Sequence, residues 1–273
     1  MKKSFSLFLA SLTALNVFAA TQVQAQEKTV LKIASHLPPM TDIVELANEV
    51  IAEPYEIELV EVSDNIQYNE ALLNDEVYAN FAQHQPFMEI FNENNEGDLV
   101  AVQGIYNARV GFYAPEFKSI EEITDGAEVA IPSDPTNMAR ALLILESYDL
   151  ISLKEGVGFK ATLDDVEENP KNLTFTEVDL LNLTAAYEDG VDLVFNYPTY
   201  IAKIDLKPED ALFLEQDPEN TFAIQLVVRE GNKDSEETKA LIDAFTSQEV
   251  YDFLAELAKE GHLEPAFEVK AAE

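Results

Sequence analysis

The 273-residue chain contains no cysteine. This absence excludes disulfides, thiol nucleophiles, iron–sulfur clusters and thiolate zinc sites. It also leads us to expect no lipid anchor on an N-terminal cysteine. Histidine is scarce as well, since only His36, His84 and His262 occur and they stand far apart in the sequence. The pattern therefore predicts no metal site.

Positive charge is also in short supply. The chain has 17 Lys and Arg against 52 Asp and Glu, a formal net charge of −35. Such a chain repels nucleic acid and anionic membrane surfaces, so we expect neither as a partner. The acidic residues are spread along the sequence, which favours a solvated acidic surface suited to a saline environment. A face that recognises a basic partner is the alternative interpretation.

Long apolar runs are missing except at the N-terminus. Lys2 and Lys3 precede an uncharged, mostly apolar run over residues 5–20, and Val23-Gln24-Ala25 fits a cleavage site. This pattern predicts a signal peptide over residues 1–25, with cleavage after Ala19 as the alternative. We therefore expect a soluble protein exported to the periplasm.

Strand and helix patterns alternate through the rest of the chain, which predicts an α/β fold with parallel-rich sheets. In such sheets ligands bind beyond the carboxyl ends of the strands. We expect helix-capping boxes at Ser119 with Glu122 and at Thr246 with Glu249, and Thr136 as a further cap. The predicted strands cover residues 30–34, 57–62, 79–82, 99–102, 110–113, 128–131, 173–178, 191–195 and 221–228. The predicted helices cover residues 43–51, 70–73, 87–91, 138–148, 236–245 and 249–257.

Motifs of catalysis are absent. The chain has no Gly-x-Ser-x-Gly elbow, no phosphate-binding loop and no His-Glu-x-x-His. We therefore expect no catalytic residues and no cofactor. An extracellular enzyme and a surface adhesin remain as alternatives, and both are less well supported than a binding protein.

Four loops that follow predicted strands carry the informative polar and aromatic residues. One contains Asn137 and Arg140, which share a helix face, and the start of a helix with a guanidinium suits a carboxylate. Spacing alone leaves open whether Arg140 instead pairs with one of the many acids. The other loops contain His36, His84 with Phe87, and Asn196. If the four loops converge, they form a cleft with polar ends and an apolar wall.

These loops carry a resemblance to a known family. Residues 69–72 (NEAL), 79–80 (AN) and 83–87 (QHQPF) are similar to the family pattern PNEAL…DAN-x-FQHKPY, and residues 131–140 (IPSDPTNMAR) to (V/I)PNDPTNxxR. Residues 156–158, 168–173 and 228–234 match further segments. In these motifs the chain resembles the methionine-uptake solute-binding proteins, the NlpA-type lipoprotein family.

The resemblance implies a two-lobed periplasmic binding protein of type II-like architecture, with the ligand cleft between the lobes. Lobe 1 would be discontinuous, over residues 29–110 plus 226–273, and lobe 2 would cover residues 111–225. The implied partners are a methionine-like ligand, a membrane permease and its ATPase, and we expect a monomer. Arg140 would hold the ligand carboxylate, with help from Asn137 and Asn196. His84, Phe87 and Tyr113 would line the side-chain pocket.

The chain departs from the family at several cleft positions. The family's Phe-Gln-His reads Ala82-Gln83-His84 here, with Phe81 one place earlier, and in a strand that shift moves the ring to the other face. His36 and Arg109 are further departures. If Arg109 points to solvent or to an acid, we expect the ligand to be methionine. If Arg109 points into the cleft, we expect a ligand with an extra acceptor, such as a short methionine-containing peptide.

Overall fold

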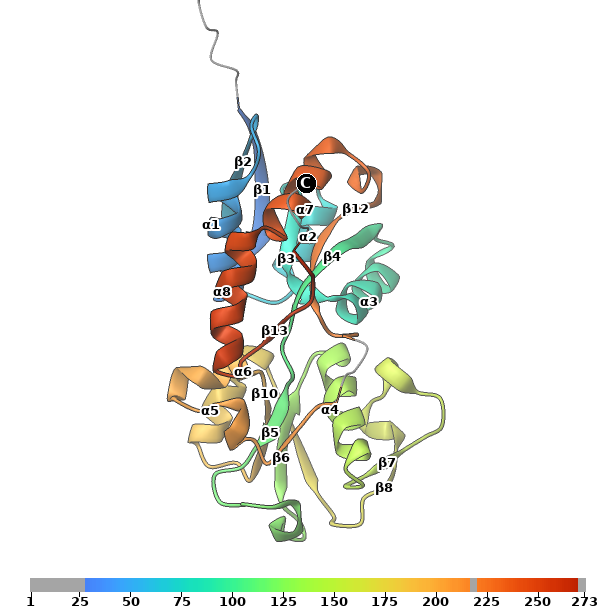
Figure 1. The fold of residues 1–273 in the computed structure, drawn as a ribbon. Coiled ribbons are helices and arrows are strands. Elements are labelled where there is room, and N and C mark those ends of the chain that lie inside the picture. The colour runs from blue at the N-terminus through green and yellow to red at the C-terminus, as the bar shows by residue number, and fades with distance from the viewer. Residues whose placement is uncertain (1–27, 217–219, 270–273) are drawn as a thin grey trace, which may run out of the picture.

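A computed structural model describes residues 28–216 and 220–269, and the signal peptide expected over residues 1–25 lies outside them. The chain forms two separate sheets, one in each half of the molecule, with helices packed around each sheet (Figure 1). A small third sheet pairs β7 (Ser152–Leu153) with β8 (Val166–Glu168). Across the described residues, no helix combines the length and apolar character needed to cross a bilayer.

The first sheet has six strands in the order β13-β4-β12-β3-β1-β2. β1 lies parallel to β2 and β3, whereas β12 runs antiparallel to both β3 and β4. Its strands are β1 (Thr29–Ser35), β2 (Tyr55–Glu61), β3 (Ala79–His84), β4 (Leu99–Asn107), β12 (Ile224–Arg229) and β13 (Glu264–Pro265).

The second sheet has five strands in the order β11-β5-β10-β6-β9. β6 lies parallel to β9 and β10, whereas β5 runs antiparallel to β10 and β11. Its strands are β5 (Gly111–Tyr113), β6 (Glu128–Pro132), β9 (Thr174–Val178), β10 (Leu193–Asn196) and β11 (Phe213–Leu214). Both sheets are thus mixed and contain more antiparallel pairing than we expected.

The chain passes twice between the two sheets. It leaves the first sheet at the end of β4 to enter β5, and it returns from β11 to β12. The antiparallel pairs involve these connecting strands, which explains why the sheets are mixed. The helices are α1 (Met40–Val50), α2 (Gln67–Leu73), α3 (Gln85–Asn95), α4 (Pro135–Ser147), α5 (Leu183–Glu188), α6 (Pro198–Ile201), α7 (Glu236–Phe245) and α8 (Gln248–Lys259).

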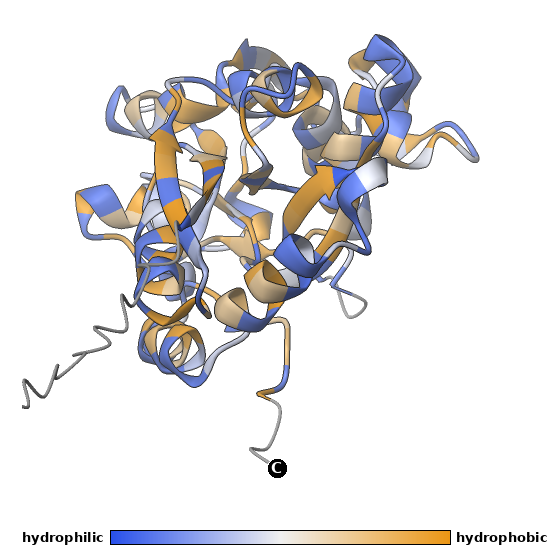
Figure 2. Ribbon diagram, turned by 90° about the horizontal axis from the view of Figure 1, so that it is seen from above, coloured by the Kyte–Doolittle hydropathy of each residue, from blue (hydrophilic) through white to orange (hydrophobic). Residues whose placement is uncertain are grey.

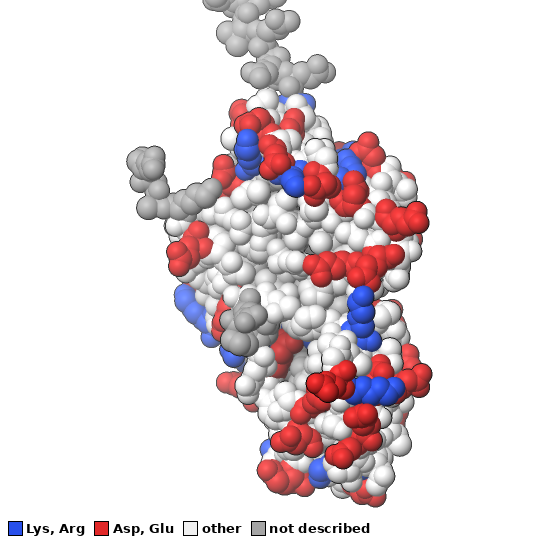
Figure 3. Space-filling model, turned by 90° about the vertical axis from the view of Figure 1, so that its right-hand side faces the viewer, with Lys and Arg blue, Asp and Glu red and all other residues white. Residues whose placement is uncertain are grey.

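The apolar pattern of the sequence explains these elements. Ile43, Val44 and Ala47 are fully buried on one face of α1, as its helical spacing predicts. Apolar residues concentrate in the strands and alternate with polar residues along the helices (Figure 2). On the outside, Asp and Glu side chains are spread over both halves of the face shown in Figure 3.

Two of the expected helix caps were wrong, and the third, Ser119, holds the N-cap position without the expected capping box. The cap of α8 is Ser247, because the Thr246 hydroxyl donates to the carbonyl of Ile242 at the end of α7. Ser119 precedes only a three-residue 3₁₀ helix, and the Glu122 carboxylate accepts from the amide of Lys118 instead. Thr136 lies inside α4, whose cap is the preceding acid at position 134.

Candidate functional site

A pocket lies where the two sheets meet, at the carboxyl ends of the parallel strands. The cavity left between its walls has a volume of about 30 Å³, far below the usual range of small-molecule pockets, so the two walls lie close together in this structure. The position agrees with the rule that ligands bind beyond the carboxyl ends of strands. The lining residues are His36, Met40, Asn65, Tyr68, Ala82, Gln83, His84, Phe87, Tyr106, Asn137, Leu180, Tyr197, Thr199, Tyr200 and Ile224.

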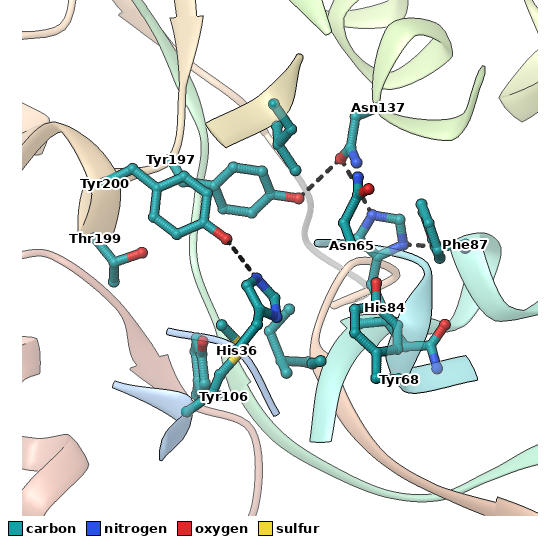
Figure 4. A pocket seen from close by; sticks show the side chains of 15 residues that line it. His36, Asn65, Tyr68, His84, Phe87, Tyr106, Asn137, Tyr197, Thr199 and Tyr200 are labelled. Carbon is teal, nitrogen blue, oxygen red and sulfur yellow. Dashed lines mark hydrogen bonds between the residues drawn. The ribbon is translucent and has the colours of Figure 1, made fainter. Parts of the chain in front are cut away.

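Aromatic rings and neutral polar groups dominate this pocket (Figure 4). Seven of the fifteen lining side chains carry an aromatic or imidazole ring, and none of the fifteen is Asp, Glu, Lys or Arg. Within the described part of the chain, no three metal-binding side chains gather as a metal site would require. The pocket is therefore built to enclose a small molecule with an apolar part and a few hydrogen-bonding groups.

His84 ends β3 and caps α3 from the first sheet. Its Nδ1 accepts a hydrogen bond from the amide of Phe87 at 3.2 Å, so the ring proton resides on Nε2. That nitrogen lies 3.3 Å from Oδ1 of Asn137, which belongs to the second half of the molecule. Burial, with the nearby charge of Arg140, lowers the pKa of His84 to about 3, so the ring is neutral.

His36 follows β1 and reaches the second half of the molecule in the same way. Its Nε2 lies 3.2 Å from the hydroxyl of Tyr200, and its ring stacks on Tyr68 with 5.7 Å between the ring centres. Its Nδ1 is buried and has no hydrogen-bond partner among the described residues. Burial lowers the pKa of His36 to about 4, so this imidazole is also neutral.

Asn137 lies in the first turn of α4 with both sides of its amide engaged. Its Nδ2 donates to the two carboxylate oxygens of Asp134 at 3.0 and 3.1 Å. Its Oδ1 accepts from the Tyr197 hydroxyl at 2.9 Å. Asp134 also accepts from the backbone amide of Asn137 at 2.9 Å as the cap of α4. These bonds hold the Asn137 side chain at the pocket wall.

Arg140 lies one turn further along α4 and is buried, but it does not line this pocket. It forms a buried ion pair with Glu215, in which Nε donates at 2.7 Å and Nη2 makes a second contact. Its Nη1 donates to the Tyr197 hydroxyl at 3.0 Å. The guanidinium carbon lies 3.9 Å from the ring centre of Phe222. The guanidinium is thus paired inside the protein rather than presented directly to the pocket.

The structure does not bring Asn196 and Tyr113 to the pocket. Asn196 is buried at the end of β10, where its Oδ1 accepts from the amide of Tyr197 and its Nδ2 donates to Thr184. The next residue, Tyr197, faces the pocket instead. Because β5 is antiparallel to β10, Gly111 lies beside Asn196 and Tyr113 lies further from the pocket edge. The Tyr113 hydroxyl is buried with no partner among the described residues, and burial raises its pKa.

Two departures from the family pattern are placed by the structure. Ala82 lines the pocket, whereas Phe81 is fully buried against Phe245 in the core behind it. Arg109 points outward with half of its side chain exposed, and its Nη2 lies 3.1 Å from a carboxylate oxygen of Glu264. On the criterion stated above, this orientation of Arg109 favours methionine over a ligand with an extra acceptor.

Sequence reasoning missed several residues of the pocket. Tyr197 and Tyr200 follow β10 in the loop that we selected for Asn196, so their position after a strand was the available signal. Tyr68 lies beside the NEAL motif on α2. No local signal points to Glu215, because it is 75 residues away from Arg140 and is one of many acids.

The chain is similar in sequence to a known family and to known proteins. The sequence model of the NlpA lipoprotein family matches residues 31–267. D-methionine-binding lipoprotein MetQ of Escherichia coli K12 is 38% identical over 214 residues, which are 77% of this chain and 79% of MetQ.

Two solved structures are also similar. A lipoprotein of the YaeC family from Enterococcus faecalis V583 is 47% identical with a TM-score of 0.78, over 87% of this chain and 99% of that chain. A nutrient-binding protein from Burkholderia cenocepacia, solved bound to methionine, is 31% identical with a TM-score of 0.81, over 87% of this chain and all of that chain. These matches confirm the expected fold class, and the chain belongs to the NlpA lipoprotein family.

Proposed function

We propose that this chain is the solute-binding component of an ABC importer and that it holds methionine, or a close relative, in the pocket between its two sheets. The proposed lobes cover residues 29–110 plus 226–273 and residues 111–225. The family consists of extracytoplasmic lipoproteins. We propose that this member acts in the periplasm, binds its ligand without chemical change and delivers it to a membrane permease driven by an ATPase.

The uncharged, ring-lined pocket is the observation that carries this proposal. Aromatic walls such as Phe87 and Tyr68 suit the thioether of methionine, since sulfur–aromatic contacts are mildly favourable. The polar end of the pocket, at Asn137 and Tyr197, lies at the start of α4. The carboxylate of Asp134 already caps this helix, so the hydrogen-bonding groups that the pocket offers at this end are the side chains of Asn137 and Tyr197.

The orientation of Arg109 separates methionine from the alternative of a short methionine-containing peptide. An extra acceptor on the ligand would need an extra donor in the cleft. Arg109 lies against Glu264 at the surface and does not line the pocket. We therefore propose the free amino acid as the ligand.

Thermal unfolding of the mature protein with a panel of amino acids tests this function. A ligand at 100 times its Kd stabilises the folded state by about 2.7 kcal/mol through mass action. We expect methionine to raise Tm by several degrees, and a Gly-Met dipeptide to raise it less. Arg109→Ala is the matched control and should respond to methionine as the unmodified protein does. No response to any amino acid, or a clear preference for the dipeptide, would contradict the proposed ligand.

A further inference from the structure

A second cavity lies where the end of α8 meets α6 and the start of α1 (Figure 1). We call it the α6–α8 crevice. Its volume is about 320 Å³, within the usual range of small-molecule sites. Thr199 lines both the crevice and the ligand pocket, which otherwise have different walls. The residues that line the crevice are Pro38, Pro39, Asp42, Thr199, Ala202, Phe253, Leu257, Glu260 and His262.

One part of the crevice wall is apolar. Phe253 and Leu257 lie four residues apart on α8, so they share a helix face, and both are only partly buried. Pro39 and Ala202 add apolar surface from α1 and from the segment after α6. This wall suits the hydrocarbon part of a ligand, and the ring of Phe253 could also attract a cation.

The charged part of the wall is acidic. Asp42 and Glu260 line the crevice, and none of its nine lining residues is Lys or Arg. Two lysines lie nearby in sequence, but the ammonium of Lys259 pairs with Glu256 and that of Lys203 lies 5.7 Å from the ring centre of Tyr200.

The helix ends at the crevice add to this preference. Glu260 is the C-cap of the 12-residue helix α8, where the helix dipole also favours a cation. At the start of α1, Asp42 offsets the positive end of the dipole. The crevice therefore attracts positive charge.

His262 supplies a hydrogen-bond acceptor that the protein does not use. The residue is 8% exposed, and its Nε2 lies 3.2 Å from a carboxylate oxygen of Glu260. In the neutral ring the proton is therefore on Nε2, and Nδ1 is an acceptor. Nδ1 is buried and has no donor in the part of the chain that the structure describes. An unpaired buried acceptor calls for an explanation, and a donor on a bound molecule is one.

These features together identify the class of ligand. We propose that the α6–α8 crevice is a second binding site, which takes a small organic cation. Its ammonium group pairs with the carboxylates of Asp42 and Glu260, and one N–H of that group donates to Nδ1 of His262. Its apolar body packs against Phe253 and Leu257. This site is independent of the ligand in the pocket between the sheets.

Titration of the full mature chain with phenethylamine tests this proposal, because the compound combines an ammonium group with an aromatic body. We expect a Kd of about 1 mM or below for a ligand of this size. The amide NMR signals of Asp42, Ala202 and Glu260 should shift, and so should the ¹⁵N signal of Nδ1 in His262. The neutral analogue 2-phenylethanol should bind at least about fivefold more weakly, since it lacks the charge.

Glu260→Gln removes the charge but keeps an oxygen that can accept from Nε2 of His262. It should weaken phenethylamine binding by about threefold or more, and Asp42→Asn should have a similar effect. Glu236→Gln is the matched control, because it removes one acidic charge from a site on α7 outside the crevice. It should leave the affinity within about twofold, and melting curves should show that all three variants fold.

Three results would overturn the proposal. Equal affinities for phenethylamine and 2-phenylethanol would show an apolar hollow with no preference for a cation. Equal losses in Glu260→Gln and Glu236→Gln would show a general attraction to the acidic surface. Signal shifts at Tyr68 and Phe87 without shifts at the crevice would place the probe in the ligand pocket. None of these results depends on whether the protein binds methionine, so the two proposals can fail separately.

Discussion

The polar groups of the two pocket walls differ in kind. The wall from the second sheet has a charged pair behind it, Arg140 with Glu215, whose charges compensate each other inside the protein. The wall from the first sheet carries His36 and His84, which burial keeps neutral. A compensated ion pair is sensitive to the loss of either partner, whereas a neutral imidazole is sensitive to acid. Loss of an ion-pair partner should therefore destabilise the wall from the second sheet, and a fall in pH should destabilise the wall from the first sheet.

We expect the largest decrease in the free energy of unfolding when the ion pair between Arg140 and Glu215 is broken. Glu215→Gln leaves the buried Arg140 without its counter-ion, and it should lower the free energy of unfolding by about 3–5 kcal/mol. Glu264→Gln is the matched control, because it breaks the pair with Arg109 in which both side chains are more than half exposed. An exposed pair contributes about 1 kcal/mol or less. Urea unfolding at pH 7.5 measures both changes, and equal losses would show that the Arg140 pair is no more important than a surface pair.

This ion pair also marks a limit of sequence-based prediction here. The alternation of strands and helices and the loops before α3 and α4 could be predicted, because prolines and apolar spacing are local signals. The partner of Arg140 could not be predicted, because Glu215 is 75 residues away in the sequence and is one of 52 acidic residues. This buried contact depends on the tertiary packing of β11 against β5, which the spacing of residues in the sequence does not predict.

Tyr113 and Asn196 illustrate a second limit. Asn196 was expected in the site because it directly follows a predicted strand, and Tyr113 because the family resemblance implied it. The antiparallel register of β5 against β10 puts Tyr113 away from the pocket edge. At the end of β10, Tyr197 rather than Asn196 is the residue that lines the pocket. Strand register depends on pairing between distant segments, and so does the choice of which of two neighbouring residues faces the pocket. The local pattern therefore identified the loop but not the side chain that lines the pocket.

When the pH falls, we expect a medium-sized decrease in the free energy of unfolding from the wall that carries the two neutral histidines. A histidine in the unfolded chain has a pKa of about 6.5, whereas the pKa is about 3 for His84 and about 4 for His36 in the folded protein. Between these values the unfolded state binds more protons, so the free energy of unfolding decreases as the pH falls below about 6.5. The loss by pH 5 should be about 2 kcal/mol for each histidine.

Urea unfolding at pH 7.5 and pH 5.0 measures this loss. His36→Phe keeps a ring against Tyr68 and removes one of the two buried imidazoles, so the change in its free energy of unfolding between the two pH values should be smaller by about 2 kcal/mol. Carboxylates contribute equally to both proteins, and the comparison cancels them. A His36→Phe variant with an unchanged pH dependence would show that the imidazole of His36 is not held neutral.

The smallest effect separates the two roles of His84, which caps α3 and also lines the pocket. Asn is among the preferred N-cap residues, so His84→Asn can still accept from the amide of Phe87, whereas His84→Ala cannot. The free energies of unfolding of these two variants should therefore differ by about 1 kcal/mol. Both variants lose the imidazole and its contact with Asn137, so both should bind methionine more weakly and by a similar factor.

Ser247→Ala removes a comparable cap from α8, away from the pocket, and should lower the free energy of unfolding by about 1 kcal/mol with no change in affinity. If His84→Asn restored the affinity as well as the cap, the imidazole would act only as the cap of α3, and the neutral wall would owe its polarity to His36 alone.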